Sequence, residues 1–268
     1  MKKVYLTLGA VVRNEEHYIE EWLTFHKLVG FERFIIALHR CTDSTLSKIK
    51  GLPFADKIVT LELLGDEQFV QLGTYTKMVR EFGHTTRWFA FFDADEFMFP
   101  LNSGDVRCFM TEFESHSGLA VHNLEFGSSN QVLKPKGLCI ETFLHRAPDS
   151  YYAHHSTKTI VDPKEAVRFL SPHLLETTRG LVTEDHQLCC LDGIWRLKKE
   201  PVFSRIRYNH YHTRSMEDWV ERNKRGNCND PNPHYRFDVN RFCECDHNEI
   251  TDTEILRFAS RLHKELQR

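Results

Sequence analysis

The stretch Trp88-Phe89-Ala90-Phe91-Phe92-Asp93-Ala94-Asp95-Glu96-Phe97 joins a run of apolar residues to an acidic turn. Consecutive apolar, mainly aromatic residues predict a strand inside an α/β sheet, where both faces of the sheet are covered. Asp93 and Asp95 follow this strand with one residue between them, so a turn can bring both carboxylates to one cation. Oxygen ligands of this kind suit Mg²⁺ or Mn²⁺. The stretch therefore predicts a central strand that ends at a metal site, against the alternative of an acidic turn without a ligand.

Toward the N-terminus, apolar runs of strand length alternate with segments of helical periodicity. Strands are predicted at residues 4–12, 34–38 and 57–61, and helices at 18–29, 44–49 and 71–82. This alternation predicts βαβ units and a mostly parallel sheet with helices on both faces. Ligands of such sheets bind beyond the carboxyl ends of the strands. Arg13, Asn14 and Asp43 stand at such ends, so we expect one crevice to collect them with the acidic turn.

After Pro100 the pattern becomes less regular. Strands are predicted at residues 119–126 and 158–161, loops at 127–130 and 134–137, and helices at 215–225 and 253–266. The sequence contains no internal repeat and no low-complexity linker. We therefore expect one α/β domain over residues 1–226, followed by a C-terminal loop and helix extension over residues 227–268.

Composition excludes several classes of protein. The 268 residues are 41% hydrophobic and 27% charged, which is ordinary globular composition and excludes disorder. The net charge of -3 argues against a nucleic-acid binder. No run reaches the roughly 18 apolar residues of a membrane span, and the N-terminus lacks the pattern of a secretory signal. We expect a cytoplasmic protein whose eight cysteines are reduced thiols.

Two patterns near the C-terminus have a functional and a structural interpretation. The final helix has a basic side that could rest on the inner face of an anionic membrane, although a solvated helix explains it as well. A cysteine- and histidine-rich segment invites a zinc site, but the single residue between Cys243 and Cys245 is shorter than the usual spacing. The cationic residues are Arg257, Arg261, Lys264 and Arg268, and the candidate zinc ligands are Cys228, His234, Cys243, Cys245 and His247.

Taken with Val12-Arg13-Asn14-Glu15, the opening stretch resembles glycosyltransferases of the family 2-like and family 92 groups. Further matching segments extend the resemblance over about residues 4–226: Gln71 and Tyr75, 126–129, 158–163, 209–215 and 224–226. The resemblance implies a GT-A (Rossmann-like) fold with a nucleotide-binding half at residues 1–100 and an acceptor half at 101–226. It also implies a UDP-sugar donor and Mn²⁺ or Mg²⁺ held by Asp93 and Asp95.

The same resemblance suggests which residues bind the donor. Arg13, Asn14 and Asp43 would line the nucleotide pocket, together with Gln71 and Asp93. Asp43 has a second interpretation as a turn or N-cap residue before the helix that follows it. Lys158 and Arg214 are candidates for electrostatic contact with the diphosphate, against the alternative of solvated cations at a strand edge.

A late histidine completes the metal shell in many GT-A enzymes. His210 and His212 lie in the matching His-Tyr-His-Thr-Arg-Ser segment and would project to the same side of a strand, so both could face the crevice. We favour His210, with His212 and His173 as the other candidates.

An inverting transfer also needs a base that deprotonates the acceptor hydroxyl. Glu125, at the end of a predicted strand, and Glu141, after a loop, are the candidates, and Asp185 is more remote. A retaining enzyme would need no such base, so the choice stays open.

These observations predict a metal-dependent glycosyltransferase that moves a hexose, with galactose as the candidate sugar, from a UDP-sugar to a glycan or glycolipid, as in surface polysaccharide synthesis. One alternative is a nucleotidyltransferase or nucleotide-sugar hydrolase on the same fold. Another is a carbohydrate- or nucleotide-binding module without catalysis.

Overall fold

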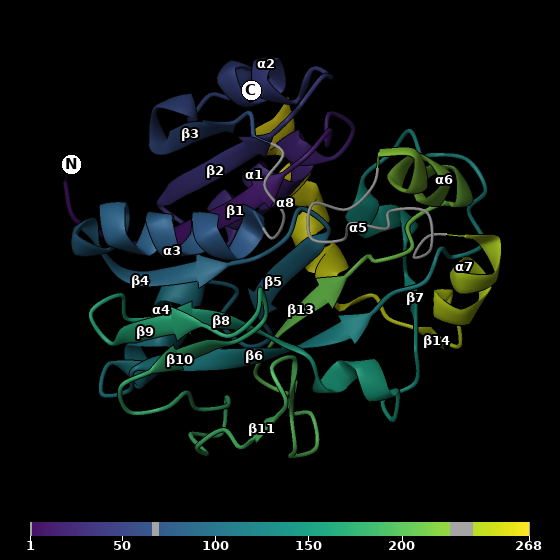
Figure 1. Ribbon diagram of the computed structural model, residues 1–268. Helices are drawn as coiled ribbons and strands as arrows, with labels where there is room; N and C mark the ends of the chain where they lie inside the picture. Colours follow the sequence, from purple (N-terminus) through teal and green to yellow (C-terminus); the bar gives the residue numbers. More distant parts are fainter. Residues whose placement is uncertain (1, 66–69, 226–237, 268) are drawn as a thin grey trace.

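The computed structural model describes residues 2–65, 70–225 and 238–267 (Figure 1). The main elements of the first half are β1 (Val4–Val12), α1 (Ile19–Leu28), β2 (Arg33–His39), α2 (Thr45–Gly51), β3 (Ile58–Leu63), α3 (Val70–Phe82), β4 (Thr86–Phe91) and β5 (Glu96–Pro100). Those of the second half are α4 (Val106–Met110), β6 (Gly118–Glu125), α5 (Cys139–Thr142), β7 (His145–Arg146), β8 (Thr157–Val161), β9 (Ala166–Phe169), β10 (Leu175–Thr177), β11 (Leu191–Asp192), β12 (Arg196–Leu197), β13 (Ile206–His210), α6 (Met216–Arg225), α7 (Val239–Cys245), β14 (Ile250–Thr251) and α8 (Ala259–Leu266).

Eight strands form the central sheet, in the order β3-β2-β1-β4-β8-β6-β13-β5. The first four are parallel, as the alternating sequence predicted. β8 runs antiparallel to both of its neighbours, β6 and β13 are parallel to each other, and β5 closes the sheet in the antiparallel direction. The predicted α/β class, with a mostly parallel sheet flanked by helices, is therefore confirmed.

The acidic turn forces this sheet to curl. Only the four residues 92–95 separate β4 from β5, although three strands lie between them in the sheet. In a flat sheet those strands would stand about 19 Å apart. The connection could reach about 18 Å only if it were fully extended, and it contains a turn instead. The edge strand β5 must therefore bend back toward β4, which encloses the space beside Asp93 and Asp95.

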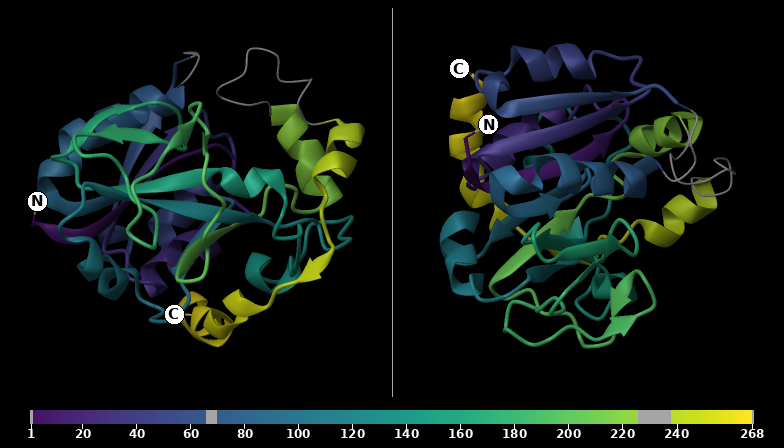
Figure 2. Two further views of the ribbon diagram at one scale, coloured as in Figure 1. Left: turned by 90° about the horizontal axis from the view of Figure 1, so that it is seen from below. Right: turned by 60° about the vertical axis from the view of Figure 1, so that its left-hand side comes forward.

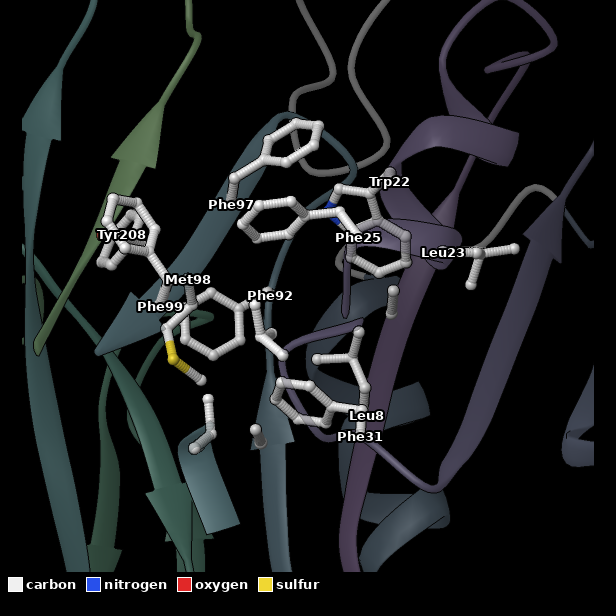
Figure 3. Close-up of a cluster of buried hydrophobic side chains, with 14 of the residues drawn as sticks. Leu8, Trp22, Leu23, Phe25, Phe31, Phe92, Phe97, Met98, Phe99 and Tyr208 are labelled. Atoms are coloured by element: carbon white, nitrogen blue, oxygen red, sulfur yellow. The ribbon is translucent and has the colours of Figure 1, made fainter. Parts of the chain in front are cut away.

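The aromatic strand β4 supplies the core on both sides of the sheet. Trp88 and Phe92 point to the face covered by α1, and Phe89 and Phe91 to the face covered by α3, as expected from the alternation of side chains along a strand. On the α1 face, Phe25 contacts the ring of Phe97 edge to face at 5.2 Å between centroids (Figure 3). Such contacts explain why this chain needs so many phenylalanines in its interior.

The C-terminal segment runs along the edge of the molecule from α7 to α8 (Figure 2). The helix predicted over residues 253–266 is a short 3₁₀ turn followed by α8, which packs on α1 through an ion pair of 2.8 Å between Lys27 and Glu265. The predicted domain boundary at residue 226 falls in a part of the chain that is not described, as do Cys228 and His234. Cys243 and Cys245 lie on α7 outside the group of described residues that is suited to a metal ion. No helix in the described ranges combines the length and the apolar character required to cross a bilayer.

A buried carboxylate joins the C-terminal segment to the sheet. Asp252 follows β14 and accepts hydrogen bonds from Arg146 of β7 at 2.9 Å and from Arg207 of β13 at 2.6 Å. Asp252 and Arg207 side chains are each 5% exposed. Because the two guanidinium ions share one carboxylate, removal of its charge would take the buried counter-ion from Arg207 and leave Arg146 with only the exposed Asp149.

We expect Asp252→Asn to lower the free energy of unfolding by about 3 kcal/mol, since breaking a buried pair costs that much. Asp149→Asn is the matched control. Asp149 contacts the same Arg146 at 2.7 Å but its side chain is 65% exposed, so its loss should have little effect. Urea unfolding of both variants measures the difference, and equal destabilisation would contradict the assigned role of Asp252.

A second buried carboxylate holds α5 against α1. Glu21 accepts hydrogen bonds from the backbone N–H groups of Cys139 at 2.7 Å and Ile140 at 3.1 Å, at the start of α5. Burial raises the pKa of Glu21 from 4.5 to about 7, although the two N–H groups act in the opposite direction. The folded protein therefore holds a proton at Glu21 at a pH where the unfolded chain has lost it.

This raised pKa predicts a stability that falls as the pH rises. The protonated group stabilises the fold below pH 4.5, and the contribution is lost as the pH passes through about 7. The loss is on the order of 3 kcal/mol for a shift of this size. Glu21→Gln cannot ionise, so its stability relative to the wild type should improve from pH 5 to pH 8. The free energy of unfolding of both proteins is measured in urea at each pH. A constant difference between the two proteins from pH 5 to pH 8 would show that Glu21 keeps an ordinary pKa.

Candidate active site

The turn between β4 and β5 holds Asp93 in a fixed position. The Asp93 carboxylate accepts from Nε2 of Gln71 on α3 and from Nζ of Lys158 on β8, each at 2.6 Å. Its backbone N–H donates to Glu96 at 2.8 Å. Both oxygens of Asp93 are thus held by protein groups, and the side chain is still 32% exposed at the edge of the sheet.

Lys158 is a fully buried cation between two carboxylates. Its Nζ lies 2.6 Å from Asp93 and 3.2 Å from Glu96, and its side chain is 0% exposed. Burial alone would lower the pKa of Lys158, but Asp93 and Glu96 hold it above its usual value. We expected Lys158 to bind the diphosphate or to be a solvated cation. The structure instead buries Lys158 against the turn between β4 and β5, where its charge is paired with Asp93 and Glu96.

Asp95 faces a different set of partners. Its Oδ2 lies 2.7 Å from Nη2 of Arg222 on α6, and its Oδ1 lies 3.8 Å from Nε2 of His210. The backbone carbonyl of Asp95 accepts from the N–H of Tyr211 at 2.8 Å. Burial raises the pKa of Asp95, but the charges of Arg222 and His210 outweigh this effect and hold it well below the usual range. The Asp95 carboxylate is therefore ionised at neutral pH.

Strand register places His210 beside two acidic residues. At the end of β13 it pairs with Glu125 of β6 on one side and with Glu96 of β5 on the other. Its Nδ1 lies 2.9 Å from Oε1 of Glu125. Burial would lower the pKa of His210, but Glu125 and Asp95 raise it to about 9. Burial and the charge of His210 lower the pKa of the neighbouring His212 to about 4.

Asp95, His210 and His212 form a group whose possible ligand atoms all lie within 4.8 Å of one another. One carboxylate oxygen and two imidazole nitrogens suit a first-row divalent cation such as Mn²⁺ better than Mg²⁺. The group therefore fits a divalent cation, which requires both imidazoles to be neutral. Asp93 is not a member. The expected ligand set of Asp93, Asp95 and His210 thus differs from the observed group, in which His212 takes the place of Asp93.

A cavity of about 480 Å³ has Arg222, the partner of Asp95, in its wall, whereas Asp95, His210 and His212 do not line it. Several of the residues expected at the donor site line it, namely Asn14, Asp43 and Arg214, whereas Arg13 and Gln71 do not. Arg222 also lines it and is the residue that connects the cavity to Asp95. The remaining lining residues are Glu15, Glu16, His17, Tyr18, Lys48, Lys134, Asp218 and Glu221.

The loops after β1 and β2 form one wall of the cavity. Asn14 has a left-handed backbone with φ of 51°. Its side chain donates to Thr42 Oγ1 at 3.1 Å and accepts from the Thr42 N–H at 2.8 Å. Asp43 accepts from the N–H groups of Glu16 at 3.0 Å and Thr45 at 3.1 Å. Asp43 therefore does act as a turn residue at the start of α2, and it also reaches the cavity.

Arg214 is expected to contact a diphosphate, but its charge is already paired. Its Nη1 lies 2.9 Å from Glu15, and the side chains are 4% and 7% exposed. Nη2 donates to the carbonyl of Ala94 at 2.8 Å, and the guanidinium lies 3.9 Å from the centre of the Tyr18 ring. Arg214 thus connects the loop after β1 to the acidic turn.

The two candidate bases lie in different places. Glu125 contacts His210 and accepts from Nδ2 of Asn123 at 2.6 Å, so it stands beside the metal-type group. Burial acts to raise the pKa of Glu125, but the charge and the hydrogen bond of His210 act in the other direction, and this pKa lies below its usual value. Glu141 lies on α5, where it contacts His263 of α8 at 2.9 Å, and it does not line the cavity. Asp185 pairs with Lys199 at 2.7 Å and is likewise absent from the cavity wall.

The sequence did not point to Arg222, which lines the cavity and contacts Asp95. A signal was available, because Asp218, Glu221 and Arg222 share the three- and four-residue spacing of one helix face and all line the cavity. The spacing of charges on a helix, however, is equally typical of a solvated face. Only the packing of α6 over the turn distinguishes the two.

Comparisons with known proteins give the family of the chain. The family described as glycosyltransferase family 92 matches residues 2–229. No curated protein is similar enough to match the chain. Among solved structures, TarS 1-349 from S. aureus is 15% identical with a TM-score of 0.40, covering 59% of this chain and 47% of that one. Glucosyl-3-phosphoglycerate synthase from Mycobacterium tuberculosis, in complex with Mn²⁺, UDP and glucosyl-3-phosphoglycerate, is 14% identical with a TM-score of 0.29, over 44% of each chain. This chain thus spans about half the length of the TarS fragment.

Direct Mn²⁺ binding distinguishes the observed group from the Asp93–Asp95 pair. We expect Asp95→Asn and His212→Ala each to weaken Mn²⁺ binding by at least about tenfold, because each removes a ligand. Asp93→Asn should bind Mn²⁺ nearly as well as the wild type, since Gln71 and Lys158 hold that carboxylate. Electron paramagnetic resonance of free Mn²⁺ gives the affinities without any substrate. Equal losses in Asp93→Asn and Asp95→Asn, with none in His212→Ala, would instead support the pair.

Proposed function

The chain belongs to glycosyltransferase family 92, and on that basis we propose that it transfers a hexose, with galactose as the candidate, from a UDP-sugar to a glycan or glycolipid. The observation that carries this proposal is the position of Arg222. This residue lies on the wall of the 480 Å³ cavity and contacts Asp95 of the metal-type group at 2.7 Å. A nucleoside in the cavity would therefore have its diphosphate directed toward Asp95, His210 and His212.

The cavity wall supports recognition of a uridine nucleotide. Oδ1 of Asp43 accepts from both the N–H and the hydroxyl of Thr45, whereas Oδ2, among the described residues, accepts only from the N–H of Glu16 and has a further lone pair that can accept the uracil N–H. The amide of Asn14 lies in the adjacent loop. Its contacts with Thr42 hold both loops at one separation, so the base would enter a preformed slot.

Three cations of the cavity wall, Arg222, Lys134 and Lys48, support binding of the diphosphate. Arg222 donates from Nη2 to Asp95 and from Nη1 to the carbonyl of His212, each at 2.7 Å, so these contacts orient its guanidinium. We infer that Arg222 shares its guanidinium between Asp95 and the phosphates. A divalent cation bound by Asp95, His210 and His212 would supply Lewis-acid stabilisation of the charge that develops on the leaving UDP.

Glu125 is the base that we propose for an inverting transfer. The positive charge of His210 lowers the pKa of Glu125, and a divalent cation bound to a neutral His210 would supply positive charge in its place, so Glu125 stays ionised and can accept a proton. The acceptor hydroxyl oxygen would form its bond to the anomeric carbon while the bond to UDP breaks, with the proton passing to Glu125. Asn123 and His210 fix the orientation of this carboxylate at 2.6 and 2.9 Å. Glu141, in contact with His263 on α8, is not assigned this role.

Binding of UDP and of uridine to one variant tests the donor site. We expect Arg222→Gln to weaken UDP binding by about tenfold, because a hydrogen bond to a charged group is lost. Uridine has no diphosphate, so its affinity should not change. Arg241→Gln removes an exposed arginine of α7 and is the matched control. Calorimetry of the wild type and both variants, with and without Mn²⁺, measures the affinities for UDP and for uridine. Equal losses for UDP and uridine would show that Arg222 acts only through the fold.

Release of UDP from UDP-galactose separates transfer from the alternatives. A transferase releases UDP mainly when an acceptor is present, whereas a nucleotide-sugar hydrolase does so without one. Binding of UDP without any release, over a panel of nucleotide sugars and acceptors, would favour a binding module.

A further inference from the structure

The hairpin formed by β11 and β12 carries an exposed tryptophan that the donor site does not use. Its strands pair Leu191 with Leu197 and Asp192 with Arg196, and Gly193 opens the turn with φ of 69°. The chain has four tryptophans, and Trp195 in this turn is 47% exposed, whereas Trp22, Trp88 and Trp219 are at most 1% exposed. Trp195 is therefore the tryptophan that solvent, or a ligand, can reach.

The hairpin is held firmly against the body of the protein. Leu197 is 1% exposed, and its carbonyl lies 3.1 Å from Nδ1 of His155. A bridge pairs Arg196 with Ser156, directly before β8. The hydroxyl of Ser171 donates to the carbonyl of Ile194 at 2.5 Å. With both strands and the turn attached, the hairpin is held in place, and β11 lies beyond β6 and β10 on the side opposite α2 (Figure 1).

This place is next to the candidate active site. The Trp195 ring contacts the ring of His173 at 5.2 Å between centroids. Burial lowers the pKa of His173 to about 3, and the nearby charges of Lys158, Asp93 and His210 act on the same imidazole. Ser156, the bridge partner of the hairpin, is two residues from Lys158 in the chain. His173 thus stands between Trp195 and the acidic turn.

We propose that Trp195 is the platform on which a pyranose ring of the acceptor stacks, so that its hydroxyl is presented toward Glu125 and the metal-type group. This proposal rests on the proposed transferase function and extends it to the acceptor. The C–H face of a pyranose is apolar and its rim is polar, so it matches a broad, rigid aromatic ring that is open on one side. The donor cavity lies at the other side of the acidic turn, against α6 and the loops after β1 and β2.

A second observation points to a ligand at the same place. Nδ1 of His173 is buried and has no hydrogen-bond partner among the residues that the structure describes. A buried polar atom without a partner costs free energy. Because this imidazole is neutral, it can donate to or accept from a sugar hydroxyl that enters beside Trp195.

The charge of the hairpin favours a sugar over a membrane as the occupant. Leu188 and Ile194 are also exposed, by 67% and 45%, as in a membrane-binding loop. Residues 185–200, however, contain three acidic and three basic residues, and one of each is paired in the Asp185–Lys199 ion pair. A surface that binds anionic lipid needs an excess of basic residues, and this segment has none.

Quenching of tryptophan fluorescence by iodide tests the proposal on the full-length protein. Iodide reaches Trp195 and not the three buried tryptophans, and Trp195→Phe should therefore abolish the quenchable fraction. We expect methyl glycosides of galactose, glucose, mannose and N-acetylglucosamine, tested one by one with UDP and Mn²⁺, to include at least one that protects Trp195. Ile194→Ala, with 45% exposure in the same turn, is the matched control and should retain the protection.

Steady-state kinetics with the saccharide that protects Trp195 from iodide is a second test of the proposal. We expect Trp195→Ala to raise the KM for that acceptor about tenfold, the size typical of a central aromatic contact, with the KM for the donor and the affinity for UDP unchanged. Trp195→Phe should recover part of the loss. The proposal is overturned if none of the saccharides protects Trp195 from iodide. It is also overturned if only anionic vesicles protect Trp195 and this protection is lost in Ile194→Ala. Failure of the wild type to bind UDP would refute the transferase function separately, because iodide protection is measured without turnover.

Discussion

The ion cluster of Lys158 with Asp93 and Glu96 is the interaction on which the rest of this structure depends. The turn between β4 and β5 meets the distant strand β8 at this cation, whose side chain is 0% exposed. A buried lysine is tolerated only with its counter-ions in place, so the cluster fixes the turn between β4 and β5 in one conformation. The charge of Lys158 also offsets one of the two negative charges that Asp93 and Glu96 carry when both are ionised. Asp95 alone among the acidic residues of the turn is left to face Arg222 and the two histidines.

The curl of the sheet explains why these partners meet. A connection of four residues cannot join β4 to a distant edge strand unless the sheet bends, and the bend brings the ends of β6, β13 and β5 around Asp95. Strand register then places His210 between Glu125 and Glu96. The same register gives the two imidazoles opposite protonation, since Glu125 stabilises the charge on His210 and that charge disfavours a second one on His212. The electrostatics of the site therefore follow from backbone geometry.

The two halves of the domain contribute different kinds of surface to this centre. The loops after β1 and β2 form a wall that is rich in hydrogen-bonding groups, which suits a base and a ribose. The second half contributes α6, with Arg222, and the β11–β12 hairpin, with Trp195. The proposed reaction brings a charged donor and an acceptor sugar to one point. The separation of a charged cavity from an exposed aromatic ring is a physical solution to that requirement.

The sequence alone determined the alternation of strands and helices in the first half, the place of the acidic turn and the family, because buried strands and their polar ends have a strong local pattern. It also proposed Asp95, His210 and Glu125 as site residues by residue type and position. It did not decide that Lys158 is buried, that His212 rather than Asp93 joins Asp95 and His210, or that Arg222 contacts Asp95. Those outcomes depend on the curl of the sheet and on the packing of α6, which bring together residues more than sixty positions apart. Local periodicity carries no information about such contacts, since they are set by which faces of distant elements must be buried together.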